Sequence, residues 1–570
     1  MKRAVPCSLL MAVVLNACGE GPDTAGRDPR AGFCDTALAR VDSFMATVAR
    51  DRPEGPRYGG TAVVGAPAEL GGMNAFAHGD AGAVQHQMFV NLMTLVRYDE
   101  ELEPMPYLAR SWEVSEDQSE LTFHLRDDVR WHDGRLTTAY DVAFTYMTAV
   151  DPRSGFPNPA FFQHYLPEER GVEVVDSFTV RFRLRPHAEF MDPWRTVAIM
   201  PRHLLGDVPP EELARHPFGD ACPVGNGPYR FVSRSPGDRW VFEANPAFPA
   251  ELGGGPYLDR YVYRVIPEQT TLLAELLTGG VDVHVAMFPN HARRAESEPG
   301  LRVMSFPYRS VLFAGWNSRV QKLSDPRVRR ALTLGMNRRQ IMVGIHGEEA
   351  VLVNSGVPPV HWAFDPTLAD SFPYDPDRAR DLLEAAGWAD RDGDGIREDP
   401  EGTPLRIELI MNQNQERQEV AEIITVQLRE IGVDLRPRVL EFATLMGRIT
   451  SPQRDFEGVL VSWEAEFRLD ERDLFHSEVV DGLWAFSGTT DPVLDRYLDT
   501  LQLAVERTSA IPIWHAYQRR LMEVHPFTYL YSSYRRNGVA DRLRDVVMDA
   551  RGEWAGIRDW WIAPEDRRVP

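Results

Sequence analysis

The chain has 570 residues, a length that predicts three or four structural units or two large lobes. Hydrophobic residues make up 43% and charged residues 26%, which is a globular composition and excludes disorder over the whole length. The formal net charge of −22 excludes the nucleic-acid-binding class, because binding that polyanion requires concentrated Lys and Arg.

The first 17 residues have the pattern of an export signal. Lys2 and Arg3 precede a mostly apolar stretch that is too short to cross a bilayer of about 30 Å as a helix. The segment ends Leu15-Asn16-Ala17-Cys18-Gly19, which resembles a bacterial lipobox, where the Cys after the cleavage site receives lipid. We expect a signal peptide over 1–17 and lipidation of Cys18; the alternative is an ordinary signal peptide with a chance Cys.

Residues 18–57 are rich in Gly, Pro, Asp and Arg, and we expect a tether that holds a short helix over 33–48. Cys34 lies in this segment, and Cys222 is the other Cys beyond Cys18. Such a pair can be oxidised outside the cytoplasm, so a Cys34–Cys222 disulfide and two separate thiols are both open. No Cys/His cluster has metal-ligand spacing, and we expect no metal or cofactor.

Strands come first in chain order. Apolar residues alternate with polar ones at 121–125 and 178–184, which predicts half-buried strands in a strand-rich region over about 85–185. Helix starts follow: Asp325 and Asp375 each precede a Pro, the arrangement of a helix cap followed by the first helical residue.

In the region from about 375 to 440, predicted helices and strands alternate, as they do in an α/β layer. Strands are predicted at 405–411 and 433–439, with a helix over 420–428 between them. Pro437 cannot donate a hydrogen bond to a neighbouring strand, so it places the later strand at a sheet edge or marks its end.

Several sequence blocks occur in a fixed order and resemble extracellular solute-binding protein family 5. This family includes the oligopeptide, dipeptide and nickel-complex receptors of ABC importers, and the resemblance covers about 58–570. The blocks are Leu108-Ala-Arg-Ser-Trp-Glu-Val-Ser-Glu-Asp117, Leu121 to Tyr146 with Trp131-His-Asp-Gly134, Gly225-Asn-Gly-Pro-Tyr-Arg-Phe231, Pro256-Tyr-Leu-Asp259, Trp316-Asn317 with Asp325 to Leu332, and Tyr374 to Trp388 with Asp392-Gly-Asp-Gly-Ile396.

The resemblance implies an α/β fold with two lobes of the periplasmic-binding-protein type II kind, closing by a hinge around a ligand. An extra subdomain is inserted in lobe I. The expected boundaries are 58–85, 186–307 and 532–570 for lobe I, 86–185 for the inserted subdomain and 308–531 for lobe II.

The resemblance also implies ligand-binding residues. In peptide-binding members a Trp followed three residues later by Asp holds the ligand's α-ammonium group; here Trp463 matches, and Glu466 stands where the Asp is expected. Glu466 is otherwise a solvated or Arg468-paired carboxylate. Further ligand contacts are expected from Asn226, Tyr229, Asn317 and Gln415.

Three motifs have competing interpretations. Trp131 to Gly134 is a turn between strands rather than a metal or acid/base site. Gly225-Asn-Gly227 lacks the third Gly of a dinucleotide fingerprint and is interpreted as a tight turn near the cleft. Asp390, Asp392 and Asp394, with Glu401 in twelfth position, mimic a calcium loop, but Arg397 occupies a position that is usually apolar.

The sequence therefore predicts a monomeric, lipid-anchored binding protein of the cell envelope or periplasm, and no catalytic motif indicates an enzyme. Its partners would be a small ligand, foremost a peptide, and the permease of an ABC importer. The alternatives are a non-peptide solute such as a metal chelate, opine or oligosaccharide, and a ligand-sensing lipoprotein without a transporter.

Overall fold

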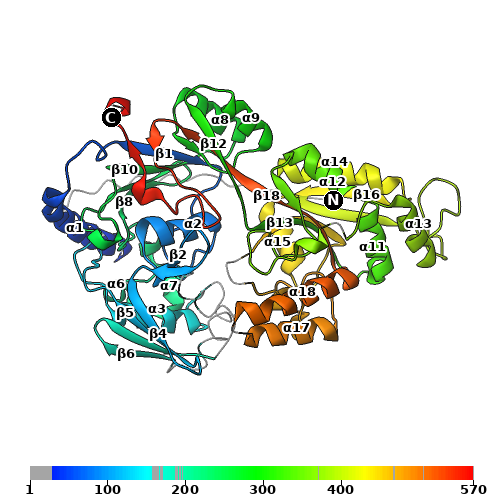
Figure 1. Cartoon of the computed structure of the whole chain (residues 1–570), viewed down its shortest axis with the longest axis horizontal. Coiled ribbons are helices and arrows are strands. Elements are labelled where there is room, and N and C mark those ends of the chain that lie inside the picture. Colours follow the sequence, from blue (N-terminus) through cyan, green and yellow to red (C-terminus); the bar gives the residue numbers. More distant parts are fainter. Residues whose placement is uncertain are drawn as a thin grey trace, which may run out of the picture.

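The computed structural model describes residues 29–156, 166, 171–185, 191, 194, 197–369, 371–465, 469–504 and 506–568. These residues form two α/β lobes that share one long strand, β18 (Phe527–Ala540), visible between them in Figure 1. The strand pairs with both halves of one large sheet, so the predicted two-lobed fold is confirmed. Its partners are β13 (Ser310–Trp316) and β14 (Ala350–Leu352) in the second lobe, and β11 (Val283–His284) and β12 (Leu301–Pro307) in the first.

The first lobe carries the part of the sheet in the order β11-β1-β10-β9-β8. Its centre is β1, which pairs in parallel with both β10 and β11. The remaining elements of this lobe are β1 (Thr61–Ala66), β8 (Tyr229–Ser235), β9 (Arg239–Ala244), β10 (Arg260–Val265), α2 (Ala81–His86), α8 (Gln269–Thr278) and α9 (Pro289–Glu296), and the chain returns to it with β19 (Leu543–Arg544) and β20 (Trp561–Ile562).

An inserted subdomain packs below this sheet in Figure 1. It holds a four-stranded antiparallel sheet, β4-β5-β7-β6. Trp194, Met200 and Phe218 are fully buried in the same apolar cluster as Phe182, so the subdomain core extends beyond the expected boundary at residue 185. The elements are β4 (Ala109–Val114), β5 (Glu120–Leu125), β6 (Val172–Asp176), β7 (Thr179–Arg183), α3 (Ala139–Val150), α6 (Arg202–Leu205) and α7 (Pro210–Leu213).

The N-terminal helix α1 (Pro29–Val48) occupies much of the segment expected to be a tether. Ala37, Val41 and Met45 lie at helical spacing and are buried in the core of the inserted subdomain, so this stretch is a packed helix and not a free linker. A disulfide joins Cys34 of α1 to Cys222, with the two Cα atoms 5.4 Å apart. Of the two states that the sequence left open, the structure has the disulfide.

The second lobe carries the strand order β16-β15-β17-β13. The Asp-Pro starts are confirmed: the Asp325 carboxylate accepts from the Arg327 N–H, and Asp375 accepts from Arg378 N–H. Pro437 lies in β16, the edge strand. The elements are β15 (Arg406–Asn412), β16 (Asp434–Leu440), β17 (Gly458–Glu464), α10 (Gln321–Ser324), α11 (Pro326–Leu334), α12 (Arg338–His346), α13 (Pro376–Ala385), α14 (Gln415–Arg429), α15 (Phe442–Thr450), α16 (Arg472–Phe475), α17 (Pro492–Leu503) and α18 (Arg507–Val524).

Two further observations qualify the expected organisation. The boundary expected between residues 531 and 532 falls inside β18, because this continuous strand belongs to both lobes. None of the helices among the described residues combines the length and the apolar run needed to cross a membrane.

A carboxylate is buried in the core of the second lobe. Glu471, directly before α16, is 4% exposed, and its Oε2 accepts a hydrogen bond from the Tyr517 hydroxyl at 2.6 Å. Burial raises the pKa of Glu471 to about 7, and the nearby Asp470 carboxylate acts in the same direction.

Loss of the disulfide should weaken the fold. Closing a long loop restricts the unfolded chain, so we expect Cys34→Ser with Cys222→Ser to lower the free energy of unfolding by about 2–4 kcal/mol. Urea denaturation checks this, and reduced wild-type protein should match the double variant, which itself should not respond to reductant. Equal unfolding midpoints for oxidised wild type and the variant would contradict a structural role.

Glu471 should make stability depend on pH. Because its folded-state pKa is raised, the folded protein retains the proton that the unfolded chain releases, and stability falls as the pH rises from about 4.5 to about 7. Glu471→Gln should remove about 3 kcal/mol of this dependence, measured by urea denaturation at pH 5 and pH 8. Exposed Glu422 on α14 provides the control, Glu422→Gln. A wild-type pH slope that persists in Glu471→Gln would exclude this group as its source.

Candidate ligand-binding cleft

The carboxyl ends of parallel strands from both lobes lie around one cavity of about 730 Å³. This is the place where open α/β sheets bind ligands, and the volume is in the range of small-molecule sites. Its first-lobe wall includes Pro67 after β1, Pro267 after β10 and Ala286 after β11. The second-lobe wall includes Asn412 to Arg417 after β15 and Glu464 at the end of β17.

Arg417 is a cation on the second-lobe wall that forms no direct ion pair with any described residue. It is half-buried in the first turn of α14, where the Asn414 side chain caps the helix by accepting from the Arg417 N–H. Its guanidinium donates to the Asn412 amide oxygen, and among the described residues no carboxylate lies within ion-pairing distance of it. Burial lowers the pKa of Arg417 from its ordinary value because desolvation disfavours the charged form.

The neighbouring carboxylate, Glu416, is already satisfied within the protein. Its Oε1 lies 3.0 Å from His346 Nε2 and accepts from the Tyr531 hydroxyl at 2.9 Å. Burial acts to raise the pKa of Glu416, but the hydrogen bonds from His346 and Tyr531 outweigh it and hold the pKa below its ordinary value. The nearby Arg417 charge acts in the same direction, so Glu416 offsets part of that charge, while the guanidinium donors that Asn412 does not take remain available to a ligand.

The hinge wall of the cavity carries a second engaged carboxylate. Glu464 accepts from the Tyr308 hydroxyl at 2.6 Å and pairs with Arg309 at 3.2 Å. On the first-lobe side, Arg535 lies 4.1 Å from the centre of the Tyr308 ring and pairs with Glu553 at 3.1 Å. These contacts fix the wall where β13, β17 and β18 come together.

The predicted Trp–Glu pair is only partly described. Trp463 lies on β17 between Ser462 and Glu464, but its side chain points to the other face of the sheet and packs against Trp484, with ring centres 5.6 Å apart. Glu466 lies outside the described residues. Gln415 lines the cavity, as expected.

Three of the other predicted ligand-binding residues lie inside the fold. Asn317 is buried at the opposite end of β13, where its amide donates to the carbonyls of Arg454 and Phe456. Tyr229 is fully buried in the first-lobe core, and Asn226 is 1% exposed, with its amide directed to Thr137. The structure does not bring these three side chains to the cavity.

The glycine motifs are also structural. A Cβ at Gly225 would lie 1.7 Å from the Asn91 carbonyl oxygen, so this turn needs glycine for close backbone packing. His132 of the Trp131 turn is buried and lies 3.0 Å from the Gly227 carbonyl oxygen, while Trp131 is fully buried. The His132 contact agrees with the turn interpretation of its motif, whereas Gly225 and Gly227 pack against Asn91 and do not line the cleft cavity.

One exposed aromatic residue lies at the carboxyl ends of the second-lobe strands, where the sequence pattern did not predict it. Phe442 begins α15 directly after β16, and 56% of its surface is exposed. Because β15, β16 and β17 run parallel, this position shares an edge with Asn412 and Glu464. In the sequence, Phe442 falls on the same helical stripe as the buried Leu445 and Ile449, so the pattern alone predicts burial.

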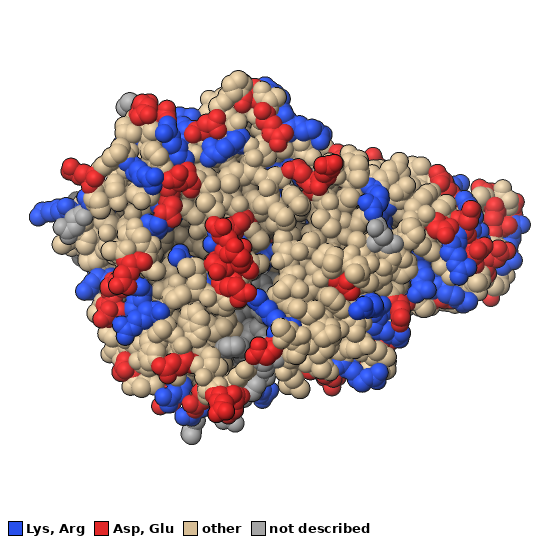
Figure 2. Space-filling model, viewed as in Figure 1, with Lys and Arg blue, Asp and Glu red and all other residues tan. Residues whose placement is uncertain are grey.

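A second contact region joins the lobes, apart from the residues that line the ligand cavity. The hairpin of β2 (Val96–Tyr98) and β3 (Pro104–Pro106) faces a second-lobe loop around Trp362 across a cavity of about 340 Å³. Glu103 of this hairpin pairs with Arg507 of α18, and the Arg507 guanidinium lies 5.6 Å from the Trp362 ring centre. In Figure 2, acidic side chains gather beside the boundary between the lobes.

The acidic loop after α13 lies apart from the cleft. Ligand oxygens of Asp390, Asp392, Asp394 and Glu398 come within 4.8 Å of one another, so Glu398 stands in the group where Glu401 was expected. The Asp390 carboxylate already accepts from the N–H groups of Gly393 and Gly395, which is the pattern of a tight turn.

Comparisons with known proteins agree with this geometry. The family model described as bacterial extracellular solute-binding proteins, family 5, matches residues 103–475. The oligopeptide-binding protein AppA of Bacillus subtilis is 26% identical over 516 residues, covering 89% of this chain and 92% of that protein. Its structure in complex with a nonapeptide superposes with a TM-score of 0.79 at 25% identity, covering 89% of this chain and 100% of that chain.

Two other relatives carry different ligand names. The dipeptide-binding protein of Escherichia coli is 28% identical over 386 residues, covering 64% of this chain and 68% of that protein. Heme-binding protein A of Haemophilus influenzae is 28% identical over 383 residues, covering 63% of this chain and 66% of that protein.

Proposed function

The chain belongs to the bacterial extracellular solute-binding proteins of family 5, and we propose that it captures a peptide between its two lobes and presents it to the permease of an ABC importer. The relatives named for oligopeptides and dipeptides support peptide as the ligand class. A relative named for heme supports a non-peptide solute as the second candidate.

The observation that carries the peptide proposal is Arg417 in the cavity wall, which forms no direct ion pair with any described residue. A half-buried guanidinium is costly to leave unpaired, and a carboxylate is the partner that its planar donors fit best. Every peptide carries such a group at its C-terminus. We assign Arg417 to the α-carboxylate of the ligand.

The other end of the ligand is assigned from the sequence. We propose that Glu466, two residues beyond the end of β17, receives the ligand's α-ammonium group, because a carboxylate at a closing cleft requires a cation. Gln415 and Phe442 would contact the ligand between these charged ends, and Trp463, which packs against Trp484 on the other face of the sheet, would support this wall from behind. The peptide then bridges the two lobes and stabilises their closed arrangement.

The site of action follows from the N-terminal segment and the family. We propose that Cys18 carries the lipid anchor, that the protein acts as a monomer in the periplasm or cell envelope, and that it has no catalytic activity of its own. The packed and disulfide-bonded α1 would then hold the folded body close to the anchor.

The role of Arg417 is tested with peptides of graded length as free acids and as C-terminal amides, by isothermal titration calorimetry. Wild type should prefer the free acid by at least about tenfold, since a charge-assisted hydrogen bond contributes about 2 kcal/mol. Arg417→Gln should abolish this preference, whereas the exposed control Arg429→Gln on the same helix should keep it. Equal affinity of wild type for acids and amides would contradict the assignment, and no peptide binding at all would contradict the function.

The role of Glu466 is tested at the other end of the same peptides. Glu466→Gln should weaken peptides with a free amino terminus by about tenfold and leave N-acetylated peptides nearly unchanged, because only the former carry the paired cation. Glu384→Gln, an exposed change on α13, is the control. A variant that discriminates between free and acetylated peptides as strongly as wild type would remove Glu466 from the site.

A further inference from the structure

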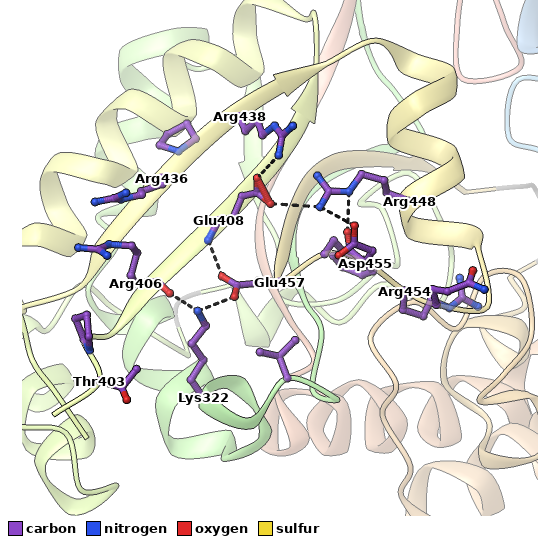
Figure 3. Close-up of a pocket in the computed structure, with 15 residues that line it drawn as sticks. Lys322, Thr403, Arg406, Glu408, Arg436, Arg438, Arg448, Arg454, Asp455 and Glu457 are labelled. Carbon is purple, nitrogen blue, oxygen red and sulfur yellow. Dashed lines mark hydrogen bonds and ion pairs between the residues drawn. The ribbon is translucent and has the colours of Figure 1, made fainter. Parts of the chain in front are cut away.

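A second cavity, of about 1160 Å³, opens on the second lobe. The ligand cleft lies at the carboxyl ends of the strands of this lobe, and the second cavity lies toward their amino ends. It is formed by the amino-terminal halves of β15 and β16, by α15 and by the residues before β17 (Figure 3). Six cationic side chains lie around it in a protein whose formal net charge is −22. They are Lys322, Arg406, Arg436, Arg438, Arg448 and Arg454.

Part of this charge has a structural purpose. β15 pairs with β17 only at Leu409 and Ile410, so the earlier backbone groups of β15 face the cavity. Glu457 accepts from the Glu408 N–H at 2.8 Å, and Lys322 pairs with Glu457 at 2.6 Å and also donates to the Arg406 carbonyl. Lys322 and Glu457 thus provide hydrogen-bond partners for backbone groups of β15 that β17 does not pair.

Four arginines share three carboxylates, one of which is Asp455, 3.2 Å from Arg448. Arg406 and Arg436 both reach the same oxygen of Asp434, at 2.7 and 3.1 Å. Arg438 and Arg448 approach each other across Glu408, at 2.9 and 3.4 Å from its two oxygens (Figure 3).

Many of the donors of these arginines therefore have no partner. Arg406 uses only its Nε and Arg438 only one terminal nitrogen for hydrogen bonds within the part of the chain that the structure describes. Arg436 and Arg438 are each 58% exposed, and because they are two residues apart on one strand they project from the same face. Their free donors are accessible from solvent.

The charges do not balance. Asp455 and Glu457 join Asp434 and Glu408 in pairing with five of these cations, so four carboxylates oppose five cations and one positive charge remains. The sixth cation, Arg454, is buried, donates to the backbone carbonyls of Ile449, Gly482 and Leu483, and has the Asp481 carboxylate as a charge partner. A phosphate monoester carries negative charge and three acceptor oxygens, which suits the remaining positive charge and the forked donors.

We propose that this cavity is a binding site for a phosphoryl group, held by Arg436 and Arg438 with Arg406 and Arg448 on either side. The site is separate from the peptide cleft and does not depend on the proposed function. The phosphoryl group can belong to a free anion or to the headgroup of an anionic lipid, and the chemistry of recognition is the same.

The test uses the full folded chain and two probes at constant ionic strength. Pyrophosphate binding is measured by isothermal titration calorimetry, and lipid binding by co-sedimentation with phosphatidylglycerol vesicles against phosphatidylcholine vesicles. We expect wild type to bind at least one probe and Arg436→Gln with Arg438→Gln to weaken that binding by about tenfold or more. Arg378→Gln, whose side chain is 60% exposed on α13 of the same lobe, should bind as wild type does.

The outcomes are distinct. Binding of pyrophosphate, with loss in the double variant, supports a free-anion site; binding of phosphatidylglycerol alone, with the same loss, supports a lipid headgroup. Absence of wild-type binding to both probes, or equal weakening by Arg378→Gln, would overturn the proposal. A melting temperature of the double variant near that of wild type separates lost binding from lost folding.

Discussion

The structure depends on β18, because this one strand belongs to the sheets of both lobes. It pairs with β13 and β14 up to Ser533 and with β12 from Tyr534 onward, so the change of partners falls between adjacent residues. Ser533 and Tyr534 also line the cavity between the lobes. Movement of one lobe against the other must therefore pass through residues that line the cavity, and a ligand bound there would be coupled to closure.

Charge is arranged differently at the two ends of the strands in the second-lobe sheet. At the cleft, Glu416 and Glu464 are hydrogen-bonded to His346, Tyr531 and Tyr308. The cation Arg417 interacts with Glu416 at longer range but forms no direct ion pair among the described residues. At the opposite end, arginines on β15, β16 and α15 share too few carboxylates. The second lobe thus has two separate surfaces with cationic groups that could bind an anion. The first lies in the cleft against the first lobe, and the second is open to solvent.

The fold was predictable where local chemistry decides it. The caps at Asp325 and Asp375 and the edge position of Pro437 follow from backbone chemistry that the sequence displays directly. The core boundary beyond residue 185 was not predictable, because the burial of Trp194 depends on contacts with distant elements. The site was less predictable still. Gln415 reaches the cavity as expected, whereas Tyr229 and Asn317 keep their polar groups inside the fold. Only the three-dimensional pairing of the carboxylates shows that Arg417 has no direct ion pair among the described residues.

The central claim is that a peptide occupies the cleft between the lobes. Native mass spectrometry of protein purified gently from its own host tests this most directly. The account predicts additional masses on the folded protein that tandem fragmentation resolves into peptides, and that disappear after unfolding and refolding. A bound mass that fragments as a non-peptide compound, retained across independent preparations, would contradict it.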